Sequence, residues 1–128
     1  MNDMQHAIEN AKGWLGSIEE MLETEWELAA QAAGWAGPLR DQRIEESVLS
    51  VMVRDGWRAP GADREPPEEY EILLATGGPA LRIFGTLDQH CQPATAELQM
   101  QDWGTPWTRY PAPEETLLRF ASVFWFGE

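Results

Sequence analysis

The amino-acid sequence predicts an α+β domain in which terminal helices flank an antiparallel sheet. Apolar residues recur at three- and four-residue intervals over residues 1–34 and again over 113–126, as is typical of amphipathic helices. Between these segments, residues 47–101 alternate apolar and polar side chains with the period of two that strands show. The 128 residues suffice for one domain with its own core, so residues 1–128 are predicted to fold as a single domain.

The acidic N-terminal segment is predicted to form two helices rather than one. Gly13 and Gly16 interrupt its apolar stripe. Each glycine costs about 1 kcal/mol in a helix interior, so we expect a break or kink there. Ser17, with Glu20 three residues later, has the pattern of a capping box and predicts the start of the second helix.

Four strands are predicted, and their short links favour an antiparallel meander. The longest link, residues 56–69, contains three prolines and two glycines, which forbid regular structure. Gly77, Gly78 and Pro79 predict a hairpin turn rather than a phosphate-binding loop, because no lysine or helix start follows them. The alternating stretches begin at Ser47, Tyr70, Leu81 and Ala94.

The predicted C-terminal helix follows an aromatic loop, DWGTPWTRYPAP. Pro113 suits the first helical turn, and Glu114 and Glu115 favour the positive end of the helix dipole. Gly127 is expected to end the helix, and a single connection, residues 36–46, is expected between the N-terminal helices and the sheet.

The net charge of the chain indicates which class of partner the protein binds. Nine basic and 22 acidic side chains give a net charge of −13, which repels nucleic acid and anionic lipid. We therefore expect a basic protein partner, no direct nucleic-acid binding and no membrane binding. The single cysteine cannot form an internal disulfide, and the N-terminus lacks the pattern of a secretion signal, so we expect a soluble cytoplasmic protein.

Few residues favour catalysis or metal binding. The common zinc sites need three or four ligands, and the histidines and cysteine of this chain are His6, His90 and Cys91. No nucleophile-elbow motif accompanies them. We expect a protein that is not an enzyme and has no metal or cofactor.

The aromatic loop has three open interpretations. Asp102 with a second carboxylate suits acid–base hydrolysis of sugars beside aromatic rings. Alternatively, Asp102 stabilises a turn through Gly104 while Trp103 and Trp107 cover the sheet edge. As a third possibility, residues 102–110 form a pocket for a small ligand or peptide, with the two tryptophans as rigid anchors.

Acidic side chains form two clusters. The helical cluster contains like-charge pairs four residues apart, each destabilising the helix by a few tenths of a kcal/mol, with no cation on the second predicted helix to relieve them. Such clusters are either a solvated face or a surface that imitates the phosphates of a nucleic acid and occupies a basic channel. The expected contacts with such a partner are Glu19, Glu20, Glu23 and Glu27 in the helix, Glu65 and Glu68 in the second cluster, and Trp103 and Trp107 as candidate anchors.

Three strings, VRDGWRAPG, EEYEILLATGGPALRIFG and QDWGTPWT, span about Val53 to Thr108. They resemble a family of small proteins carried by bacteriophages and integrative elements. Small acidic proteins of such elements often resemble anti-CRISPR or anti-restriction inhibitors, which implies a Cas protein or a restriction enzyme as partner. Together with the charge, the resemblance predicts a non-enzymatic inhibitor, monomeric or homodimeric.

Overall fold

The computed structural model describes residues 4–31, 42, 44–63, 66–102 and 104–127, and the side chains of these except residues 24–31. It confirms the α+β class. A short helical turn, residues 44–47, lies in the predicted connection just before the sheet. The main elements are α1 (Met4–Gln31), β1 (Ser50–Arg54), β2 (Glu69–Ala75), β3 (Ala80–Thr86), β4 (Glu97–Gln101), β5 (Thr108–Tyr110) and α3 (Glu114–Ala121).

The strands form one antiparallel meander in the order β1-β2-β3-β4-β5. The four predicted strands are present, but the prediction of a four-stranded sheet is wrong, because residues Thr108–Tyr110 add a fifth strand beside β4. A strand of three residues is too short to show a period of two. Gly77 has a φ of 102° in the turn between β2 and β3. Residues with a side chain rarely adopt this backbone conformation.

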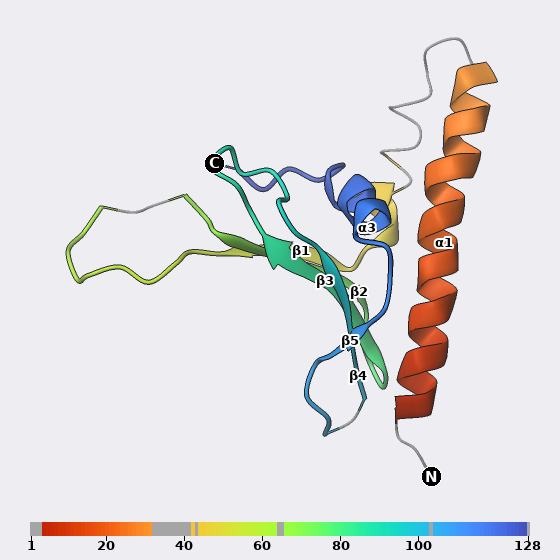
Figure 1. The fold of residues 1–128 in the computed structure, drawn as a ribbon, viewed down its shortest axis with the longest axis horizontal. Coiled ribbons are helices and arrows are strands. Elements are labelled where there is room, and N and C mark those ends of the chain that lie inside the picture. Colours follow the sequence, from red (N-terminus) through yellow and green to blue (C-terminus); the bar gives the residue numbers. More distant parts are fainter. Residues whose placement is uncertain (1–3, 32–41, 43, 64–65, 103, 128) are drawn as a thin grey trace.

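The core lies between the sheet and two helices. Alternate residues of the central strands are buried on one face, and α1 and α3 lie on that side of the sheet (Figure 1). Burial of each such side chain contributes about 1.5–3 kcal/mol. The sheet residues of this core include Tyr70, Ile72, Leu74, Leu81, Ile83, Leu98 and Met100.

The predicted break in the N-terminal segment is wrong, because α1 is one continuous helix from Met4 to Gln31. Gly13 and Gly16 are exposed, and Ser17 is internal to the helix rather than its N-cap. Ala11 and Ile18, on either side of the glycines, are both fully buried. Packing of one helical face on the sheet therefore outweighs the propensity cost of the two glycines.

Alanine at Gly13 and Gly16 is expected to stabilise the protein by about 1 kcal/mol per site. A Cβ at either position meets nothing within 4 Å, so only the conformational entropy of the unfolded chain changes. Urea unfolding of both single variants measures the effect. A loss of stability in either variant would contradict a continuous helix at these positions.

The C-terminal helix is shorter than predicted and covers Glu114–Ala121 rather than residues 113–126. The Ser122 hydroxyl donates to the carbonyl oxygen of Leu118 at 2.6 Å, and the chain then leaves the helix. Phe126 is buried with its ring centroid 4.8 Å from that of Tyr70. Phe126 thus packs on the sheet from a segment beyond the helix, while Trp125 is exposed, and Gly127 does not end the helix.

Tyr70 is expected to make stability depend on pH in the alkaline range. Its buried hydroxyl donates to the carbonyl oxygen of Thr95 at 2.7 Å. Burial raises the pKa of Tyr70, and the Glu114 carboxylate raises it further. The folded state favours the neutral phenol, so this stabilisation is complete below the unfolded pKa of about 10 and is lost as the pH rises above that value.

Tyr70→Phe is expected to cost about 1 kcal/mol at neutral pH, because the hydrogen bond is lost. The variant should also lose less stability than the wild type above pH of about 10. Chemical unfolding across this pH range measures both effects. Equal alkaline losses in the two proteins would show that Tyr70 is not the titrating group.

Candidate protein-binding surface

The solvent side of α1 carries exposed carboxylates. Glu9, Glu19, Glu20 and Glu23 are exposed, and we call them the acidic helix face. They span about 21 Å of helix axis. The opposite side of the helix packs on the core through Ala7, Ala11, Ile18, Met21 and Leu22. This packing fixes which carboxylates point to solvent and holds them on a rigid element.

One member of the acidic helix face has a cationic partner on another helix. Arg119 of α3 donates from Nη1 to Oε1 of Glu23 at 3.0 Å. The sequence pattern predicted only that no cation of the second predicted helix relieves these glutamates, and the cation that pairs with Glu23 comes from another helix. Among the described residues, no ion pair involves Glu19 or Glu20. Together with Glu9, which likewise has no ion pair among the described residues, these two carboxylates are the part of the face that remains available.

The other predicted acidic contacts do not join this face. The side chain of Glu27, and Glu65 as a whole, lie outside the described residues. Glu68 is exposed and belongs to the segment 55–68, which extends from the sheet on the side away from α1 (Figure 1). The structure therefore does not bring Glu68 together with the glutamates of α1.

The start of the aromatic loop is a tight turn. Thr105 donates its N–H to the carbonyl oxygen of Asp102 at 3.0 Å, and Asp102 donates its N–H to Oγ1 of Thr105 at 2.9 Å. Gly104 has a φ of 74°, a conformation that favours glycine. Asp102 is itself buried. These contacts support the interpretation of Asp102 as a residue of the turn. Trp103 lies outside the described residues.

Trp107 is half-buried and stacks on an arginine of β3. The Arg82 guanidinium lies 4.3 Å from the centroid of the Trp107 ring and 4.6 Å from that of Phe84. It also donates to Glu71 at 2.6 Å and to Gln99 at 2.7 Å. Trp107 therefore helps to hold Arg82 in place on the sheet face opposite the helices.

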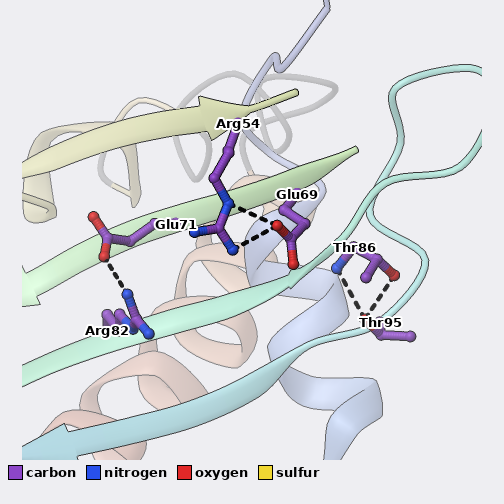
Figure 2. Close-up of polar contacts among 6 residues, drawn as sticks. All are labelled: Arg54, Glu69, Glu71, Arg82, Thr86 and Thr95. Carbon is purple, nitrogen blue, oxygen red and sulfur yellow. Dashed lines mark hydrogen bonds and ion pairs between the residues drawn. The ribbon is translucent and has the colours of Figure 1, made fainter. Parts of the chain in front are cut away.

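Three arginine–glutamate pairs cross this open face of the sheet. The pairs Arg54–Glu69 and Arg82–Glu71 lie side by side on the strands, with the helices behind the sheet (Figure 2). Because positive and negative side chains are equal in number, this part of the sheet is neutral in a chain of net charge −13. The pairs are Arg54–Glu69 at 2.7 Å, Arg82–Glu71 at 2.6 Å and Arg109–Glu97 at 3.8 Å.

The sequence pattern alone does not predict these ion pairs. The alternation in EYEILLA and ALRIFGT places Glu71, Arg82 and Phe84 on the polar face, but the cross-strand partners depend on the register, which alternation alone does not set.

A shallow hollow of 280 Å³ lies over β1, β2 and β3 beside Met52 and Phe84. A pocket was expected at residues 102–110, and a separate hollow of 170 Å³ includes Arg109 of that segment beside Glu97 and Glu114.

His90 and Cys91 lie in a loop whose own contacts account for its shape. The backbone N–H groups of His90 and Gln92 donate to Oδ1 of Asp88 at 2.7 and 3.1 Å. These two hydrogen bonds lower the pKa of the Asp88 carboxyl, and the bond from Gln92 has the larger effect. Cys91 has a φ of 59° within this turn. Nowhere in the described ranges do three His, Cys, Asp or Glu side chains gather as metal ligands.

No protein-family model, curated protein or solved structure matches the chain. Of the helices that the structure describes, none combines the length and apolar character needed to cross a bilayer. The candidate site therefore rests on the geometry of the acidic helix face.

Proposed function

We propose that the chain is a non-enzymatic inhibitor that binds a basic protein surface through the acidic helix face. The observation that carries this proposal is the exposure of Glu19 and Glu20 on a rigid helix, without ion-pair partners among the described residues. Carboxylates whose charges are already paired contribute little to attracting a partner. The principal contacts are Glu19 and Glu20. Glu9 lies on the same face of the helix, nearer its N-terminus.

Long-range charge supports the same function. A net charge of −13 draws the protein toward basic surfaces and raises the rate of association. Proteins that bind nucleic acid present such surfaces, because they neutralise phosphates with Lys and Arg. The protein would occupy that surface in place of the nucleic acid.

The partner class is a nucleic-acid-guided effector or a restriction enzyme of the host cell. The resemblance of residues 53–108 to proteins of bacteriophages and integrative elements favours a Cas protein, so the proposed activity is that of an anti-CRISPR inhibitor. It would act in the cytoplasm, where such complexes meet DNA. The second predicted role, binding of a small ligand or peptide by residues 102–110, receives no specific support from the placement of Trp107 under Arg82.

Affinity capture tests the proposal. Tagged protein is incubated with lysate that contains CRISPR effector complexes and is then eluted across a salt gradient. We expect a basic Cas subunit to be retained at low salt and released steeply as the salt concentration rises.

Two variants with the same change in net charge make the test specific. Glu19→Gln with Glu20→Gln should reduce capture about tenfold, because two exposed ion pairs are lost. Asp63→Asn with Glu68→Gln, in the segment on the side away from α1, should leave capture close to wild type. Equal capture by all three proteins, or no retained basic protein, would contradict the proposal.

A further inference from the structure

The two edges of the sheet differ in how well they are protected. β5 has three residues, two of them polar, and Pro111 follows it directly. Short length, charge and proline are the devices that keep an edge strand from pairing with another chain. β1 has five residues, SVMVR, without a charge or proline before Arg54. Within the part of the chain that the structure describes, β1 pairs with β2 alone, so its outer edge has unpaired backbone groups.

Exposed apolar side chains gather along the same strand. Of the five large hydrophobic residues that are exposed among those described, four lie within residues 49–57. Met52 is 61% exposed and Val53 44% exposed, although both belong to a strand. A long apolar edge of this kind is a template for strand pairing. The four residues are Leu49, Met52, Val53 and Trp57.

The charges at the two ends of β1 have opposite signs. Glu45 and Glu46 are exposed just before the strand, while Arg54 and Arg58 are exposed at and after its end. The two arginines pair with Glu69 and Asp55 of their own chain, yet their side chains remain 68% and 43% exposed. An antiparallel second copy would bring the basic end of one strand to the acidic end of the other, twice.

We infer that β1 pairs antiparallel with β1 of a second copy about a two-fold axis at Met52, joining the two sheets into one. In this register Met52 faces Met52, Val51 faces Val53, and Ser50 faces Arg54, so apolar residues meet apolar residues and no like charges oppose each other. Two copies of an acidic chain repel one another over most of their surface, so a contact between them requires an apolar segment that is flanked by charges of both signs. The inference goes beyond the proposed function and is independent of it.

Sedimentation of the full chain over the micromolar range tests the pairing. The wild type should sediment as a dimer, and Met52→Lys as a monomer, because two lysines would then face each other at the axis. Trp125→Lys is the matched control, since it places the same charge on an exposed apolar side chain outside β1 and should remain dimeric. Circular dichroism checks that each variant is folded.

A mixing experiment tests the register. Met52→Glu alone should also be monomeric, whereas an equimolar mixture with Met52→Lys should recover the dimer through a lysine–glutamate pair at the axis. A wild type that stays monomeric, a Met52→Lys variant that stays dimeric, a Trp125→Lys variant that dissociates, or a mixture that stays monomeric would each overturn the inference.

Discussion

Replacing Gly85 with alanine is expected to destabilise the fold by about 3 kcal/mol. A Cβ at this position would overlap the backbone carbonyl oxygen of Thr95 and would lie 2.9 Å from Cε1 of the buried Tyr70 ring. That carbonyl oxygen is the acceptor of the Tyr70 hydroxyl, so any shift that relieves the overlap also disturbs a buried hydrogen bond.

The backbone at Thr95 has little freedom to move. Oγ1 of Thr95 accepts from the N–H of Thr86 at 2.9 Å and lies 2.9 Å from the Thr86 hydroxyl (Figure 2). The neighbouring Ala94 N–H donates to the carbonyl oxygen of Thr86 at 2.8 Å. Urea unfolding of Gly85→Ala measures the cost, with Gly13→Ala as the control for the same substitution at an open position. Wild-type stability of Gly85→Ala would contradict the close approach of β3 and Thr95.

Phe120→Ala is expected to cost about 3–5 kcal/mol, which is a large part of the stability of a domain of this size. The Phe120 side chain is fully buried where α3 packs on α1 and β4, and its ring centroid lies 5.8 Å from that of Phe124. Truncation would leave a cavity beneath the helix that the surrounding side chains fill only in part.

Trp125→Ala is the control for this prediction, because Trp125 is exposed and its truncation should change the free energy of unfolding by less than about 0.5 kcal/mol. Thermal or urea unfolding of both variants provides the comparison. If Phe120→Ala cost no more than Trp125→Ala, the placement of α3 over the core would be wrong.

Local patterns were sufficient to predict four of the five strands of the sheet. In β2, Tyr70, Ile72 and Leu74 are all buried, as the alternation of EYEILLA requires of a strand with one face on a core. The fold class and meander follow from repeated alternation joined by short turns. The fifth strand could not be predicted in this way, because Thr108–Tyr110 is defined by its hydrogen bonds to β4 rather than by its own pattern.

Tertiary contacts explain the errors in the helices. Local propensity favours a break at Gly13, whereas the burial of Ala11 and Ile18 on one face keeps α1 continuous. The apolar stripe at the C-terminus predicted helix through Phe126, but Phe126 instead packs on Tyr70 from an extended segment. In α1 the sequence pattern identified which residues are buried more reliably than the conformation that buries them, whereas at the C-terminus Trp125, within the predicted helix, is exposed.

The candidate site was predictable in part for the same reason. Exposure of Glu19 and Glu20 follows from their position opposite the apolar stripe of α1. The pairing of Glu23 with Arg119 joins residues 96 positions apart. The stacking of Trp107 on Arg82 likewise joins separate segments of the chain, and no local spacing contains that information.

Competition with DNA is the sharpest test of whether the protein occupies a nucleic-acid-binding surface. The basic partner recovered by affinity capture is loaded with labelled DNA, and the protein is added at a fixed low salt concentration. We expect the wild type to displace the DNA, and Glu19→Gln with Glu20→Gln to need about ten times the concentration to do so. Simultaneous binding of DNA and protein to the partner, or equal displacement by the wild type and the variant, would contradict the proposed function.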